Sequence, residues 1–279
     1  MSEPPSLIRP TSYRWFMLPA GVGAELASCQ PREDLLGSGL EMTPRERVLV
    51  VENEDGAGPE MFGQWLSGAG VKVDLWRPYR GETMPEATTG AVMVLGGEMS
   101  AWDDHGSPWL GQVRTLLAEA TAKGQAVLGI CLGAQMLAVA CGGRVEESQH
   151  GGELGLARIE LTAEARRDRL FGAIASPAEA VVWHNDEVVQ LPEGAVLLGS
   201  SPACKVQAFR IGDRAWGVQF HPEVTTAALE AWAAADGSQR PGRQARLQLV
   251  IAEVAAAEAR FLACWQGFAE RFADIVLQN

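Results

Sequence analysis

The sequence has no Cys-x-x-Cys pair, although it contains five cysteines. They are scattered along the chain at Cys29, Cys131, Cys141, Cys204 and Cys264. An odd, scattered set argues against a disulfide framework or a zinc ribbon, and it is typical of a reducing compartment. His105 and His150 also lack the spacing of metal ligands. We therefore expect a cytoplasmic protein with no metal site and no cofactor.

Positive charge is scarce as well. Lys and Arg number 23 against 35 Asp and Glu, which gives a formal net charge of −12. An acidic surface repels phosphate backbones, so nucleic acid is not expected as a partner.

No hydrophobic run is clean enough to predict a membrane span. The residues between Lys123 and Arg144 carry no charge and match the length of a spanning helix, about 20 residues, but they include several glycines and two glutamines. The segment divides into a β-like half, 126–130, and a helix-like half, 134–140. We interpret it as a buried strand, a tight turn and a buried helix, and we expect no membrane contact.

Residues 1–45 show no sustained hydrophobic period and are rich in Pro, Gly and Ser. Leu26–Cys29 resembles a lipoprotein cleavage box, so export is the alternative to a cytoplasmic location. However, Pro19 and Gly21 interrupt the preceding apolar run, Glu25 lies beside the box, and a secretory signal usually has a cleaner apolar core. We expect a poorly structured leader.

The folded region is expected to start at residue 46. Apolar, mostly β-branched runs at 48–51, 71–75, 91–95 and 126–130 predict strands, and apolar residues at helical spacing predict helices around 62–66, 109–117 and 134–140. This order predicts an α/β fold with a mostly parallel central sheet and helices on both faces. Short β-like segments between 154 and 219 predict further strands, some of them antiparallel.

From residue 225 onward the pattern is helical. Apolar residues in steps of three and four form one stripe: Leu247, Val250, Val254, Ala257, Phe261, Cys264, Phe268, Phe272 and Ile275. We therefore expect a leader over 1–45, one domain over 46–224 and a helical extension over 225–279 packed on that domain. A homodimer seam is the alternative use of the stripe.

The segment Gly129–Gly133 has the form Gly-x-Cys-x-Gly between an expected strand and an expected helix. This is the spacing of a nucleophile elbow, a sharp strand-to-helix turn. Such a turn places the Cys131 sulfur at the carboxyl end of the sheet and at a helix N-terminus, where the dipole favours thiolate. The alternative is a small buried cysteine in a tight turn.

Two further segments supply what a cysteine nucleophile needs. His221 and Glu223 follow the apolar strand at 216–220, and alternate side chains of an extended chain project the same way. They suit a general base and its orienting carboxylate. Gly96 and Gly97 end a strand, where backbone N–H groups can form an oxyanion hole. Taken singly, a solvated His–Glu pair and an ordinary Gly-Gly turn are the alternatives.

Together and in this order, the three segments resemble the class I (triad) glutamine amidotransferases over residues 48–223. Residues 183–188 resemble the Ser-His-Gly-Asp segment of the stand-alone, GMP-synthase-like branch, with Trp and Asn replacing Ser and Gly. The resemblance implies a catalytic triad of Cys131, His221 and Glu223. It further implies hydrolysis of the glutamine side-chain amide through a Cys131 thioester, which releases glutamate and ammonia.

The resemblance also implies roles for neighbouring residues. The backbone N–H groups of Gly97 and Leu132 would stabilise the oxyanion, and Gly96 would border the substrate. Gln135, one helical turn beyond the cysteine, would contact the substrate amide, and Glu153 would pair with the substrate ammonium.

Three features leave the exact reaction open. Glu98 stands where the family often has proline, and it puts a charge beside the oxyanion loop that can alter the substrate. No Walker-type phosphate loop occurs, so we expect a synthetase partner in trans or release of ammonia to solvent. His184 and Asp186 either shape the pocket or meet an acceptor domain.

The alternatives to a glutamine-hydrolysing amidotransferase are a γ-glutamyl hydrolase acting on a γ-glutamyl amine or peptide, a cysteine-elbow acyltransferase or esterase, and a non-catalytic regulatory homologue.

Overall fold

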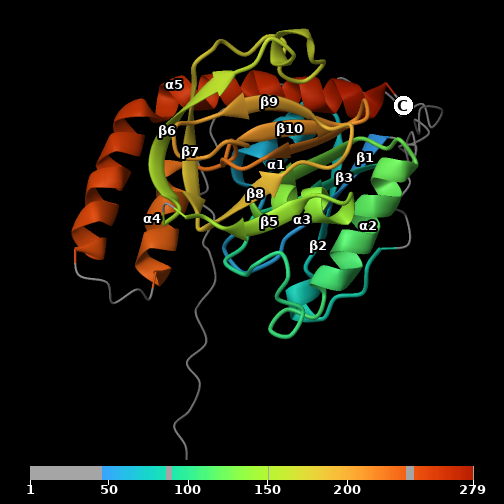
Figure 1. Ribbon diagram of the computed structural model, residues 1–279, viewed down its shortest axis with the longest axis horizontal. Coiled ribbons are helices and arrows are strands. Elements are labelled where there is room, and N and C mark those ends of the chain that lie inside the picture. Colours follow the sequence, from blue (N-terminus) through green and yellow to red (C-terminus); the bar gives the residue numbers. More distant parts are fainter. Residues whose placement is uncertain (1–45, 86–89, 150, 237–241, 279) are drawn as a thin grey trace, which may run out of the picture. The chain divides into compact units, whose positions relative to one another are not determined.

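A computed structural model describes residues 46–85, 90–149, 151–236 and 242–278 of the chain. The expected leader over 1–45 lies outside the described residues. The main sheet contains β1 (Arg47–Val51), β2 (Lys72–Trp76), β3 (Ala91–Val94), β4 (Val127–Ile130), β6 (Glu153–Leu161), β7 (Ala178–His184), β9 (Val196–Ser200), β10 (Ala208–Ile211) and β11 (Ala215–Val218). Their order across the sheet is β2-β1-β3-β4-β11-β10-β9-β6-β7 (Figure 1).

The central part of this sheet is parallel. Strands β2, β1, β3, β4 and β11 pair in parallel, whereas β10, β9, β6 and β7 continue the sheet through antiparallel pairings. Every residue of β3 and β4 is buried, as expected for strands covered on both faces. The predicted α/β fold with a mostly parallel centre and added antiparallel strands is confirmed.

Helices cover both faces, also as predicted. They are α1 (Glu60–Gly68), α2 (Leu110–Ala122), α3 (Leu132–Ala140), α4 (Thr226–Ala235) and α5 (Arg243–Leu277), with short 3-10 turns at Pro78–Arg80 and Ala165–Arg167. Alternate side chains of β1 pack into the two different cores on either face of the sheet. Val48 and Val50 pack in one core with α1, α4 and α5, and Leu49 and Val51 pack in a second core with α2 and α3.

The C-terminal segment contains two helices where the sequence predicted continuous helix. Helix α5 starts after Gly242, whose positive φ of 77° is a conformation that glycine adopts readily. All residues of the predicted stripe are buried except Cys264, which is half-buried. Phe268 meets Phe62 and Phe171 edge to face, so the stripe packs on the chain's own core.

Sequence reasoning missed one small element. Strands β5 (Arg144–Glu147) and β8 (Asp186–Gln190) form a separate two-stranded antiparallel sheet. Both are short and carry several charged residues, so they lack the apolar run by which the other strands were recognised.

The uncharged stretch before Arg144 forms β4 and α3, as predicted. Among the described helices, none combines the length and the apolar character needed to cross a bilayer.

Candidate active site

Cys131 sits between β4 and α3 in a strained backbone conformation. Its φ of 52° and ψ of −108° are rare for a residue with a side chain. Its backbone N–H donates to the Val218 carbonyl oxygen at 2.8 Å, which ties the turn to β11. A Cβ on Gly133 would collide with the Val94 carbonyl oxygen, so only glycine fits there. The predicted elbow is present, and it holds the sulfur at the N-terminus of α3.

His221 and Glu223 lie beyond the end of β11 and are almost fully buried. His221 Nδ1 and Glu223 Oε1 are 2.8 Å apart. The backbone N–H of His221 donates to the Val181 carbonyl oxygen at 2.7 Å, an isolated bridge that ties the residue to β7. Trp232 of α4 meets the imidazole ring edge to face at 5.0 Å. Backbone pairing and ring packing therefore fix the imidazole.

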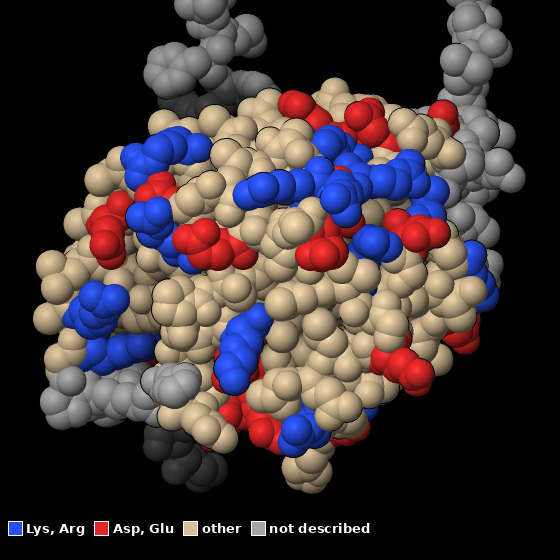
Figure 2. Space-filling view, turned by 45° about the horizontal axis from the view of Figure 1, so that its top comes forward, with Lys and Arg blue, Asp and Glu red and all other residues tan. Residues whose placement is uncertain are grey.

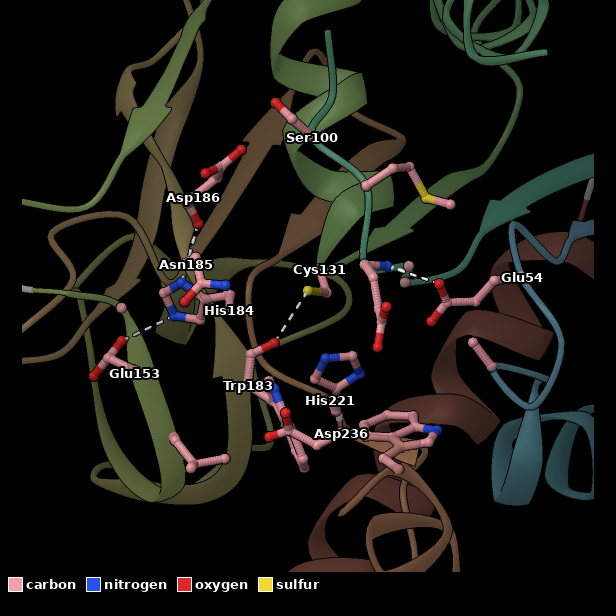
Figure 3. Close-up of a pocket in the computed structure, with 18 of the residues that line it drawn as sticks. Glu54, Ser100, Cys131, Glu153, Trp183, His184, Asn185, Asp186, His221 and Asp236 are labelled. Atoms are coloured by element: carbon pink, nitrogen blue, oxygen red, sulfur yellow. Dashed lines mark hydrogen bonds and ion pairs between the residues drawn. The ribbon is translucent and has the colours of Figure 1, made fainter. Parts of the chain in front are cut away.

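The three predicted triad residues come together. A Cβ on Gly96 would lie 3.0 Å from His221 Cε1 and 3.6 Å from Cys131 Cβ, so both side chains adjoin one glycine. Figure 3 shows Cys131 and His221 side by side. Burial alone lowers the pKa of His221, but Glu223 and Cys131 outweigh it and raise the pKa to about 10. The imidazole therefore lies between the sulfur and a carboxylate, and both favour its protonated form.

The two predicted oxyanion donors are also neighbours. A Cβ on Gly97 would lie 3.0 Å from the Leu132 side chain. Asn53 Nδ2 donates to the carbonyl oxygens of Leu95 at 2.9 Å and Gly96 at 3.4 Å. These bonds fix the segment that follows β3. Because the first N–H groups of a helix have no intrahelical acceptor, the Leu132 N–H can serve a developing negative charge.

A pocket of about 850 Å³ is lined by Gly96, Gly97, Cys131, His221 and Glu223 among others. It lies at the carboxyl ends of the parallel strands, where ligands bind in open α/β sheets. The lining includes Gln135 and Glu153, which were predicted, and Glu54, Asp55, Glu147, Trp183, Asn185, Trp232, Asp236 and Arg243, which were not.

The missed lining residues come from distant segments. Glu54 follows β1, and its position just past a strand end was the available signal. Trp232 and Asp236 belong to the segment that was expected as an extension beyond residue 224, and no local sequence signal places them beside His221. The pocket is thus completed by α4.

Gln135 reaches the pocket, but its amide nitrogen is already engaged. Nε2 donates to the Asp186 carbonyl oxygen at 2.8 Å and to Gln219 Oε1 at 3.2 Å. Gln219 Nε2 in turn lies 3.6 Å from Cys131 Sγ. Gln135 therefore supports the wall around the sulfur, and its contact with a substrate amide stays a prediction.

Glu153 is likewise bound within the protein. Oε2 accepts from Gln207 Nε2 at 2.6 Å and lies 3.1 Å from His184 Nε2, while Oε1 accepts from the Ser201 hydroxyl at 3.0 Å. Pairing with a substrate ammonium would compete with these bonds. His184 was expected either to shape the pocket or to meet an acceptor domain. Its ring lines the pocket and contacts Glu153 through Nε2 and the Asp186 carbonyl oxygen, 3.0 Å from its Nδ1.

A second Cys-His-Glu cluster adjoins this wall. Ligand atoms of Glu153, His184 and Cys204 lie within 4.8 Å of one another, close enough to hold a metal ion. However, burial raises the pKa of Cys204, and its thiol donates to the Val206 carbonyl oxygen at 3.5 Å. Thiolate is the form that binds metals and attacks carbonyl groups. The bonds of this cluster indicate a structural role.

Comparison with known proteins agrees with this geometry. A family profile described as "Glutamine amidotransferase class-I" matches residues 60–232, more than half of the chain. Gamma-glutamyl peptidase 3 of Arabidopsis thaliana is 31% identical over 169 residues, which cover 58% of this chain and 67% of that protein. The glutamine-hydrolyzing GMP synthase of Natronomonas pharaonis has one subunit that is 40% identical over 99 residues, which cover 35% of this chain and 52% of that subunit.

The likeness extends to three dimensions. A solved structure of a glutamine amidotransferase from Thermotoga maritima matches with a TM-score of 0.74 and 25% identity, covering 82% of this chain and 98% of that chain. The chain spans about half the length of the GMP synthase subunit that it resembles. The elbow cysteine, the buried His–Glu pair and the profile match agree: the chain belongs to the class I glutamine amidotransferase family.

Proposed function

We propose that the chain hydrolyses the side-chain amide of glutamine, or the equivalent amide of another γ-glutamyl compound, through a thioester on Cys131. One observation carries this proposal. A cysteine at a strained helix N-terminus shares a pocket with a buried imidazole that is hydrogen-bonded to Glu223 at 2.8 Å.

The first half of the reaction forms the thioester. The Cys131 thiolate attacks the amide carbon, and the N–H groups of Gly97 and Leu132 bind the oxyanion. The protonated His221, held by Glu223, gives its proton to the departing nitrogen as the carbon–nitrogen bond breaks. A raised His221 pKa suits this role because the proton is in place before the attack.

The second half regenerates the enzyme. His221, now neutral, takes a proton from water, and the hydroxide attacks the thioester carbon. The carbon–sulfur bond breaks, glutamate leaves, and the thiolate–imidazolium pair returns. Glu223 keeps the imidazole oriented in both halves.

A γ-glutamyl peptide or amine is the second candidate substrate. A pocket of about 850 Å³ has the size of sites that hold drug-sized ligands, which are larger than glutamine. The relative from Arabidopsis is named a gamma-glutamyl peptidase, which supports the same candidate.

The test is release of glutamate and ammonia from glutamine by the purified full-length chain. Cys131→Ala should lower kcat by about 10³-fold or more, as removal of a nucleophile does. The matched control is Cys141→Ala, a half-buried cysteine outside the pocket, which should leave kcat within about twofold. Turnover in Cys131→Ala equal to that of the unmodified chain would refute the proposal. A folded unmodified chain that hydrolyses neither glutamine nor a γ-glutamyl peptide or amine would also refute it and would favour a non-catalytic homologue.

A synthetase partner in trans is part of the proposal. The relative from Natronomonas is named as one subunit of a GMP synthase, which supports an acceptor on another chain. Affinity purification from the native cell should recover a synthetase together with this chain. Recovery of the chain alone, with full glutaminase activity, would favour release of ammonia to solvent. A homodimer remains a prediction, although the apolar stripe that suggested it packs on the chain's own core.

A further inference from the structure

Negatively charged side chains predominate in the lining of the pocket around Cys131. Eight of its lining residues are carboxylates: Glu54, Asp55, Glu98, Glu147, Glu153, Asp186, Glu223 and Asp236. Arg243 is the one Lys or Arg among the described lining residues, and its Nε is already bound to Asp236 Oδ2 at 2.7 Å. The arginine also stacks over the Trp183 ring. A ligand that enters this pocket therefore meets an excess of negative charge.

Two of these carboxylates lie next to each other. Glu54 follows β1 and Glu98 follows β3, and Glu54 Oε2 accepts the Glu98 backbone N–H at 2.9 Å. Burial raises the pKa of Glu54, and the neighbouring Glu98 charge raises it further, although the bond from the Glu98 N–H opposes both. Among the described ion pairs, neither carboxylate has a partner. This contrasts with Asp55, which pairs with Arg80.

The pair lies in the same pocket as His221. Glu54 interacts electrostatically with His221, the group that hands its proton to the departing nitrogen. Figure 3 shows Glu54 on the opposite side of Cys131 and His221 from Asn185 and Glu153. Glu98 adjoins Gly97, the expected oxyanion donor. A group attached to the departing nitrogen would thus approach both carboxylates.

We propose that Glu54 and Glu98 bind a positive charge on the departing half of the substrate, so that the substrate class is a γ-glutamyl amide of a diamine or similar cationic amine. This inference rests on the proposed function. The carbon–nitrogen bond of the amide breaks, the departing nitrogen takes the His221 proton, and water supplies the hydroxyl that ends on glutamate. The distal ammonium takes no part in bond breaking and serves recognition alone.

The experiment compares two amides of equal length. In γ-glutamyl-1,4-diaminobutane the chain ends in an ammonium group, and in γ-glutamyl-pentylamine it ends in a methyl group. The unmodified chain should show a kcat/KM for the cationic amide about tenfold or more above that for the neutral one, the effect of one partly desolvated charge interaction. The difference should lie in KM, because the ammonium is remote from the reacting carbon.

Variants assign the preference to the two carboxylates. Glu54→Gln keeps an acceptor for the Glu98 N–H, and Glu98→Gln keeps the side-chain length. Each should reduce the preference, and the double variant should bring it to about twofold or less. The readout is the ratio of kcat/KM for the two amides within each variant, so a loss of rate common to both amides does not affect it. The matched control is Glu164→Gln, an exposed acidic residue outside the pocket, which should keep the full preference.

The outcomes separate the two proposals. Equal or faster turnover of the pentylamide by the unmodified chain overturns the inference and leaves the proposed function intact. A full preference in the double variant overturns the assignment to Glu54 and Glu98. If a chain with a normal thermal unfolding transition hydrolyses neither amide nor glutamine, the proposed function fails, and this inference fails with it.

Discussion

At the scale of single residues, the protonation of His221 links catalysis to stability. Its pKa is about 10 in the folded chain, against an ordinary value of 6.5. Because the folded value is the higher one, protonation of His221 stabilises the folded state fully below about pH 6.5. That contribution is lost as the pH rises from there through about 10. The sulfur and Glu223 supply this stabilisation against the cost of burial.

Glu223→Gln tests this link. Removing the carboxylate charge should lower the pKa of His221, so the alkaline limb of the kcat/KM profile should move to lower pH. We also expect kcat to fall by about 10²- to 10⁴-fold, as in other triads that lose the orienting carboxylate. The measurement is a pH–rate profile of both proteins. An unchanged alkaline limb would mean that Glu223 does not control the imidazole.

Gly133→Ala tests the elbow. The added Cβ would meet the Val94 carbonyl oxygen, a backbone atom that cannot rotate away. We expect a loss of about 1–3 kcal/mol in the free energy of unfolding, together with loss of activity. The control is Gly68→Ala at the end of α1, where a Cβ meets nothing within 4 Å. Equal unfolding midpoints in denaturant for the two variants would refute this account.

At the scale of elements, α5 packs against the segment that leads into His221. Trp265 is fully buried, its ring centroid lies 4.7 Å from that of Phe220, and its Nε1 donates to the Glu179 carbonyl oxygen at 2.9 Å. Phe220 directly precedes His221. Packing of α5 therefore reaches His221, the proposed base, through one aromatic contact.

Trp265→Ala should therefore cost both stability and rate. The expected loss in the free energy of unfolding is about 3–5 kcal/mol, typical of a large buried aromatic side chain. Leu249→Ala on the same helix is the control, since Leu249 is 65% exposed and should change stability by less than about 0.5 kcal/mol. Thermal unfolding and kcat measure both effects. A Trp265→Ala protein as stable as Leu249→Ala would contradict this role.

Elements with a strong local signal could be predicted from the sequence. The apolar runs of β1, β3 and β4 and the helical spacing of α5 identified those elements. Strands β5 and β8 could not be recognised, because they carry no apolar run and form only by backbone pairing with each other across about 40 residues of chain. The sequence predicted a strand or helix only where burial of that element required a run or a stripe of apolar residues.

The candidate site divides in the same way. The Gly-x-Cys-x-Gly turn and the His221–Glu223 spacing are local, so the sequence revealed them. The bonds of Glu153 to Ser201 and Gln207 join positions 48 and 54 residues apart. Such contacts arise only when β6 and β9 meet in the folded sheet. The sequence therefore did not reveal that Glu153 is hydrogen-bonded within the protein, and a contact with a substrate ammonium was expected instead.

At the scale of the whole molecule, charge is unevenly distributed. The net charge of the chain is −12. Acidic side chains do not dominate the face shown in Figure 2, where Lys and Arg gather in a band. The active-site pocket, by contrast, combines eight carboxylates with one arginine. Such a cleft concentrates cations near its mouth.

Salt should therefore discriminate between the two test amides. Raising NaCl from about 50 mM to about 500 mM should lower kcat/KM for γ-glutamyl-1,4-diaminobutane several-fold, because the Debye length shortens from above 10 Å to below 5 Å. Turnover of γ-glutamyl-pentylamine is the internal control and should change little. A parallel decline for both amides would point to a general effect of salt on the protein.

The position of α5 has a consequence for synthesis of the chain. Strands β1 to β4 and helices α1 to α3 leave the ribosome first, yet one face of their sheet is covered by a helix that ends at Leu277. Until that helix has emerged, Phe62, Phe171 and Phe220 face water in the nascent chain. Folding of this domain must then wait for its last 35-residue helix. The interval before that helix emerges is when a chaperone has apolar surface to bind.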